Sequence, residues 1–202
     1  MNKSSLISIL IELYKFVDKK RKFQLILVLI FMVFVSLAEL FSVGSIIPFL
    51  GIMTEPNIVF KKYKELNIDE YIYFESSDAL LLPITICFIS AISISAIFRI
   101  ILVWMQNRVS YGIATDFSIN IFSKTLYQSY EVHLSRNSSE VISGIANKAS
   151  TINDNGIMPS LVIISNTILL SFFFFTLAFF NPVATLCAVS YTHLTLPTIL
   201  LV

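Results

Sequence analysis

The sequence predicts an all-α integral membrane protein, and three observations support that fold class. Hydrophobic residues make up 56% of the 202 positions and charged residues only 13%. The mean hydropathy is +0.81, far above that of a water-soluble domain of this size, so much of the surface must face lipid. The apolar residues also gather in long runs that are sufficient for helices crossing a bilayer.

Residues 1–22 precede the first apolar run and are expected to form an interfacial elbow. Apolar residues recur on one face of a helix over residues 5–17, a pattern typical of a helix lying along a membrane surface. Four consecutive basic residues follow at positions 19–22. By the positive-inside rule, this cluster places the N-terminus in the cytoplasm.

The first span is predicted over residues 23–53, which are almost uninterruptedly apolar. About 30 residues exceed the roughly 20 needed to cross the hydrocarbon core, so this helix must tilt, kink or protrude. Gly44 and Pro48 predict a kink near its far end, because proline removes one backbone hydrogen bond. Residues 54–79 then form an external loop with six acidic residues against three lysines.

Two further spans and the start of a fourth follow. The second is predicted over residues 80–104, with Trp104 at interfacial depth. The third is predicted over residues 159–180. A turn at Asn181-Pro182 precedes an apolar run that begins at position 183.

The polar segment between the second and third spans, residues 105–158, is predicted to form a cytoplasmic helical hairpin. Apolar residues recur every four positions in its first half and at multiples of three to four in its second half, which indicates two amphipathic arms. Arms of about 20 to 25 residues would project roughly 30 to 40 Å from the membrane. The tip is expected at residues 129–139.

This order of elements resembles the transmembrane domain of type 1 ABC exporters, in which the first coupling helix sits at the hairpin tip. Residues 38–50 and 130–140 are similar to bacterial flippases of lipid-linked oligosaccharides and to related polysaccharide exporters. The resemblance covers most of residues 5–188. It implies a multi-pass protein of the bacterial inner (plasma) membrane, an incomplete exporter bundle, and a homodimer of full-length half-transporters that moves an amphipathic substrate.

The resemblance also implies that the hairpin tip docks into a nucleotide-binding domain and receives its ATP-driven motion. The alternative is a simple solvated turn. His133 has no second ligand or nucleophile near it in sequence, so neither a metal site nor a catalytic base is expected there. The residues expected to dock are Tyr130, Glu131, His133, Leu134, Ser135, Arg136 and Asn137.

Two ionisable residues, Glu39 and Arg99, fall at membrane depth. Each would cost a few kcal/mol facing lipid, so both are expected to face the bundle interior or a water-filled cavity. Arg99 could meet the pyrophosphate of a lipid-linked substrate. Two structural alternatives stay open: an interhelical pair with Glu39, and snorkelling of Arg99 to the inner headgroups.

Catalytic machinery is not expected in these residues. The sequence contains no GxxxxGK[ST] phosphate loop, so ATP and magnesium are expected on a separate nucleotide-binding domain of the parent translocase, with no cofactor here. The net charge of +1 gives no indication of a nucleic-acid partner. Two other function classes stay open: a non-transporting membrane scaffold or sensor with a cytoplasmic hairpin, and a secondary transporter, which usually shows internal repeats or interrupted helices.

Residues 189–202 are expected to be a tail derived from sequencing adapter. Residues 189–198 match a translated transposase adapter, codon by codon. The last four residues fit a short index followed by the rest of the adapter. Residues 189–202 are therefore excluded from the fold prediction, as an engineered scar would be.

Overall fold

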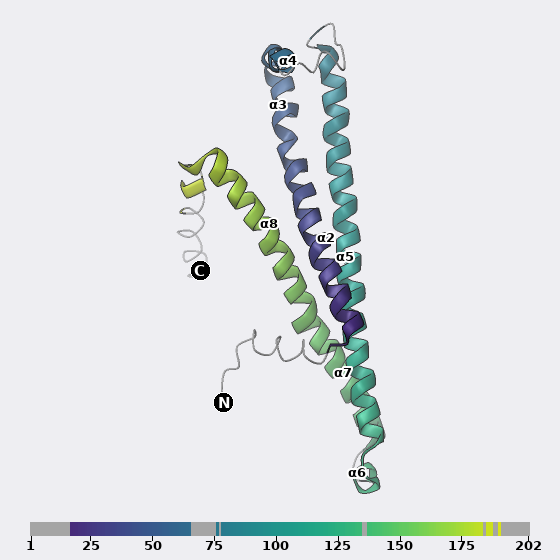
Figure 1. The fold of residues 1–202 in the computed structure, drawn as a ribbon. Coiled ribbons are helices and arrows are strands. Elements are labelled where there is room, and N and C mark those ends of the chain that lie inside the picture. The colour runs from purple at the N-terminus through teal and green to yellow at the C-terminus, as the bar shows by residue number, and fades with distance from the viewer. Residues whose placement is uncertain are drawn as a thin grey trace, which may run out of the picture. The chain divides into compact units, whose positions relative to one another are not determined.

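The computed structural model describes residues 17–65, 76, 78–134, 137–183, 185–187 and 190, and the regular elements in this part of the chain are helices (Figure 1). Three of them are long and apolar enough to cross a membrane: Lys19–Thr54, Leu81–Leu126 and Val141–Phe180. The all-α fold class with long, apolar helices is thus confirmed. The chain divides into two compact units, one from Met1–Met32 and Ile100–Asn166, the other from Val33–Arg99 and Thr167–Val202.

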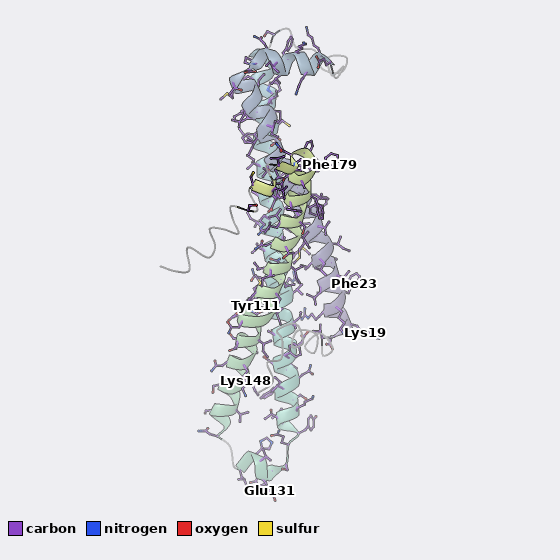
Figure 2. All side chains as sticks on the ribbon, turned by 90° about the vertical axis from the view of Figure 1, so that its left-hand side faces the viewer. Lys19, Phe23, Tyr111, Glu131, Lys148 and Phe179 are labelled. Atoms are coloured by element: carbon purple, nitrogen blue, oxygen red, sulfur yellow. The ribbon has the colours of Figure 1, made fainter. Side chains whose placement is uncertain are left out.

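The first unit contains a helical hairpin. Its descending arm is the second half of α5 (Leu81–Leu126), its tip is the short helix α6 (Tyr130–Leu134), and its returning arm is α7 (Ser138–Ile152). Figure 2 shows Glu131 at the tip, between the two arms. The returning arm continues through a π-helix, η3 (Asn153–Ile157), into α8 (Met158–Phe180).

The returning arm begins where an asparagine caps it. The Asn137 side-chain oxygen accepts a hydrogen bond from the Ser139 backbone N–H at 3.0 Å. This bond satisfies one of the donors left free at the start of a helix, and asparagine is among the residues preferred there. Local sequence therefore sets the point at which the chain leaves the tip and turns back.

The inner faces of the arms are buried at the end away from the tip. Val109 and Ile113 of α5 are buried, as is Ala149 of α7. The apolar repeat of α5 includes Ile121, yet that side chain is exposed. Ile121 is therefore a position where the amphipathic pattern does not correspond to burial, whereas Val141 on the other arm is half-buried.

The second unit contains the break in the first long helix. The helix α2 (Lys19–Gly44) ends there and α3 (Ile46–Thr54) begins after Ser45. Pro48 has no N–H to donate to the carbonyl of Gly44, four residues earlier, which favours an interruption at this point. The Ser45 hydroxyl donates to the Ser42 carbonyl at 2.6 Å across the break.

The segment expected to be a loop, residues 54–79, differs from that expectation because it contains the helix α4 (Pro56–Glu65). Proline is favoured in the first turn of a helix, where its missing N–H has no intrahelical partner. Val59 and Phe60 of α4 pack against a small core formed by the buried residues Ile52 and Leu80. The helix was not predicted, because the segment has many charged residues and few apolar ones. Its stability comes from packing against Ile52 and Leu80, which lie outside it in the sequence.

The remaining parts of the second unit are the start of α5, preceded by the 3₁₀ helix η2 (Asp78–Leu80), and the end of α8. After α8, residues 182, 183 and 185–187 are again helical. Three expectations fall wholly or mostly outside the described residues. They are the elbow helix over residues 5–17 apart from Val17, the loop residues 66–75 and 77, and the tail 189–202 apart from Ser190.

Candidate functional site

The hairpin tip holds most of the residues expected to dock. Tyr130, Glu131, His133 and Leu134 lie on α6, and Asn137 caps α7. The two other expected residues, Ser135 and Arg136, lie outside the described part of the chain. The tip thus gathers aromatic, apolar, acidic and basic groups on a helix of five residues, at the end of two longer ones.

Large apolar side chains at the tip are open to solvent. Tyr130 and Leu134 are 74% and 70% exposed, and Tyr127 and Leu126, just before α6, are 90% and 58% exposed. Such side chains grouped at one end of a hairpin form a surface suited to a protein partner. Tyr127 and Leu126 could not be singled out from the sequence, because they continue the polar-apolar pattern of the arm and only the end of α5 sets them apart.

An ion pair joins the start of α2 to α5 within the first unit. The Arg21 guanidinium donates to both carboxylate oxygens of Asp116, at 2.7 Å from Nε and 3.2 Å from Nη2. Its third nitrogen donates to Gln24 at 3.0 Å. A two-point arginine–carboxylate contact fixes orientation as well as distance. This pair holds the entry of the first long helix against the descending arm.

Gly112 makes room for this pair. A Cβ at position 112 would lie 2.6 Å from Nη1 of Arg21 and 2.7 Å from its Cζ. The guanidinium therefore rests directly on the backbone of α5. From the sequence, Arg21 was recognisable only as part of the basic cluster, because a partner 95 residues away leaves no local signal.

A buried polar seam joins the two hairpin arms at the π-helix. The hydroxyl of Ser110 on α5 donates to the side-chain oxygen of Asn153, and both residues are almost fully buried. Asn153 in turn donates to Asp154 at 2.8 Å. One helical turn from Ser110, the Gln106 side-chain nitrogen is buried with no hydrogen-bond partner among the described residues. π-Helical turns are frequent at functional positions, and here the wide turn carries Asn153 into the seam.

The second unit brings Glu39 and Arg99 together. The Arg99 Nη1 lies 3.4 Å from Glu39 Oε1, and the side chains are 37% and 19% exposed. Of the interpretations open from the sequence, the interhelical pair is the arrangement present. Pairing lowers the cost of two ionisable groups at membrane depth.

No protein-family model and no curated protein sequence matches this chain. Within the part of the chain that the structure describes, no group of three or more His, Cys, Asp or Glu side chains could hold a metal ion. The first unit thus offers two candidate regions, the exposed tip and the root of the hairpin, and the second unit separately offers the Glu39–Arg99 pair.

Proposed function

We propose that this chain forms the leading part of the transmembrane domain of an ATP-driven ABC exporter of the bacterial inner membrane. Its substrate would be a lipid-linked oligosaccharide or another amphipathic molecule. The observation that carries the proposal is the continuity of α5 from an apolar stretch to an exposed hairpin tip. The alternatives of a scaffold, a sensor or a secondary transporter do not require that lever.

The length of α5 supports a lever role. Its 46 residues correspond to about 69 Å at 1.5 Å per residue. The hydrocarbon core is about 30 Å thick, so roughly half of the helix would extend beyond the membrane. A continuous helix of that kind couples a movement at its outer end to its membrane-embedded end, as an ATP-driven transporter needs.

The chemistry of the tip supports a protein partner there. Tyr130 and Leu134 supply exposed apolar surface, and Glu131 and His133 supply polar groups on the same short helix. An interface commonly combines such an apolar centre with a polar rim. The proposed partner is a nucleotide-binding domain that carries ATP and magnesium, and two such half-transporters would form the working dimer.

The proposed substrate class draws on the resemblance of residues 38–50 and 130–140 and on the ion pair between Glu39, in the first of these stretches, and Arg99 of α5. Glu39 and Arg99 form a polar position between apolar helices. A guanidinium there can exchange a carboxylate for a phosphate, because each of these anions presents two acceptor oxygens that match the two parallel N–H donors of the guanidinium. The Arg99 guanidinium could then bind the pyrophosphate of a lipid carrier transiently.

The test is a reconstituted translocation assay on the full-length parent protein. We expect a fluorescent lipid-linked oligosaccharide in proteoliposomes to cross the bilayer only with ATP and magnesium. A variant of the phosphate-loop lysine in the nucleotide-binding domain is the matched control, and it should move nothing. Translocation that proceeds without ATP would favour a secondary transporter, and a protein that translocates nothing but retains a tip-bound partner would favour a scaffold.

A further inference from the structure

A groove of about 440 Å³ lies along the start of α2 and the middle of α5, entirely within the first unit. Lys20, Phe23, Leu27 and Val28 line it from successive turns of α2, and Trp104 and Arg108 line it from α5. Figure 2 shows Phe23 projecting away from the helices. Phe23 is 67% and Trp104 is 56% exposed, so the groove is open to its surroundings.

The groove has a cationic end and an apolar end. Arg21 lies beside Asp116 and Asn120, whereas Leu27 and Val28, further along α2, lie beside residues 104–109, earlier on α5. The two helices therefore run in opposite directions here. The order of lining residues from Lys20 to Val28 on α2 therefore corresponds to the order from Arg108 back to Trp104 on α5. Lys20 and Arg108 thus share one end, while Leu27, Val28 and Trp104 form the other, deeper in the apolar stretches of both helices.

The two cations are available to a ligand. Among the described residues, neither Lys20 nor Arg108 forms an ion pair, and no acidic residue lines the groove. The carboxylate of Asp116 is occupied by Arg21. Arg108 lies over the Trp104 ring, 5.1 Å from its centroid, which holds the guanidinium at the mouth of the groove and leaves its hydrogen-bond donors free for an acceptor.

We propose that this groove binds one anionic phospholipid of the adjacent membrane leaflet. The phosphodiester lies between Lys20 and Arg108, and an acyl chain lies against Leu27, Val28 and Trp104. Charge complementarity decides the headgroup, because two cations with no direct ion pair among the described residues, in a groove lined by no acidic residue, attract a net negative phosphodiester and repel the ammonium group of a zwitterionic lipid. Tryptophan suits the boundary between headgroup and chain.

The inference requires that α2 and α5 enter a membrane, and it does not depend on the exporter proposal. A scaffold or a secondary transporter with these helices would hold the same lipid. Failure of ATP-dependent translocation would therefore leave the lipid site intact, and failure of lipid binding would leave the exporter proposal intact.

The experiment compares lipid binding by the purified full chain and two double variants in detergent. Lys20→Gln/Arg108→Gln removes the charges of the groove. Lys124→Gln/Lys148→Gln removes the same charge from exposed positions of the hairpin arms and is the matched control. Native mass spectrometry titrates phosphatidylglycerol or phosphatidylcholine, and thermal unfolding reports whether each variant is folded.

We expect a single tightly bound phosphatidylglycerol on the original chain and on the control variant, and at least roughly tenfold weaker binding by the groove variant, as loss of charge-assisted hydrogen bonds predicts. Phosphatidylcholine should bind weakly to all three proteins. Equal phosphatidylglycerol binding by the groove and control variants would overturn the proposal.

A second variant, Leu27→Trp, fills the apolar end of the groove without changing charge. It should weaken phosphatidylglycerol binding while leaving any binding of inorganic phosphate unchanged. If Leu27→Trp retains the lipid, the apolar end is not the acyl-chain site and the proposal fails. If a polyprenyl pyrophosphate displaces phosphatidylglycerol at equal concentration, the occupant is the carrier lipid and our assignment to a membrane phospholipid is wrong.

Discussion

Gly112 leaves room for the Arg21 guanidinium on the backbone of α5, and this contact sets the position of the first long helix at the root of the hairpin. The pair could not be predicted from sequence, since it depends on the register of two helices that are far apart along the chain. Glu39 and Arg99 could be predicted as partners, because each would be costly alone in an apolar run. Their 3.4 Å contact agrees with one of the three interpretations that the sequence left open.

The first prediction compares two glycine-to-alanine changes in helices of the first unit. Alanine is favoured over glycine in a helix by about 1 kcal/mol, and Gly144 has open space around its Cβ position. Gly144→Ala should therefore raise the free energy of unfolding. Gly112→Ala should be about 1 kcal/mol less stable than Gly144→Ala, because its methyl group displaces Arg21 from Asp116.

Thermal or chemical unfolding in detergent measures this difference. In an Arg21→Ala background there is no guanidinium to displace, so Gly112→Ala should then stabilise as much as Gly144→Ala does. Equal stabilisation by the two substitutions in the original background would show that the ion pair is not held by the contact with Gly112.

The second prediction concerns the Glu39–Arg99 pair. Arg99→Ala leaves Glu39 without this partner at membrane depth, so the amount of folded protein in the membrane should fall along with any translocation activity. Glu39→Gln/Arg99→Gln should recover protein level relative to either single change, because neither side chain is then charged. Normal protein level with lost translocation in Arg99→Ala would instead indicate a direct contact with the substrate.

At the scale of elements, the hairpin shows where sequence patterns suffice and where they fail. The four-residue apolar repeat predicted a helical arm directly after the second span, and α5 runs unbroken from Leu81 to Leu126. The helix α4 was missed because its stability depends on packing against Ile52 and Leu80. The π-helix and the seam around Asn153 were missed too, since the relevant partner, Ser110, lies on the other arm.

The third prediction separates docking from folding at the tip. Tyr130→Ala/Leu134→Ala should leave the unfolding temperature nearly unchanged, because both side chains are largely exposed. ATP-driven translocation by the parent protein should fall at least roughly tenfold, as expected when central interface residues are truncated. Tyr111→Ala/Ile142→Ala changes an aromatic and an aliphatic side chain on the arms, away from the tip, that are also more than half exposed, at 56% and 60%. That control should retain activity, and equal activity in both variants would argue for a solvated turn.

The fourth prediction concerns the seam between the arms. Ser110→Ala and Asn153→Ala should each lower the free energy of unfolding by about 1 to 2 kcal/mol, since each leaves a buried polar partner unsatisfied. The double variant should cost less than the sum, with a coupling energy of about 1 kcal/mol. Ser90→Ala removes an exposed hydroxyl that bonds only to the carbonyl one turn back and should be nearly neutral. If the losses in unfolding free energy caused by the two substitutions simply add, the Ser110–Asn153 hydrogen bond contributes no stability and the prediction is wrong.

At the scale of the whole molecule, composition alone predicted long apolar helices, and three in the described part of the chain have the required length and hydropathy. Orientation in the membrane rests on lysine and arginine distribution, and the identity of the transporter rests on resemblance. Neither follows from helix geometry, because many functions use the same kind of helix. The central claim is therefore the proposal that this chain is the leading part of an ABC exporter.

The most direct measurement of that claim is to sequence the locus through and beyond codon 188 with a chemistry that uses no transposase adapter. We predict that the native frame departs from residues 189–202, continues through three further spans, and reaches a nucleotide-binding domain with a phosphate loop. A native frame that encodes residues 189–202, or one that continues without a phosphate loop and with no ATPase gene beside it, would contradict the account.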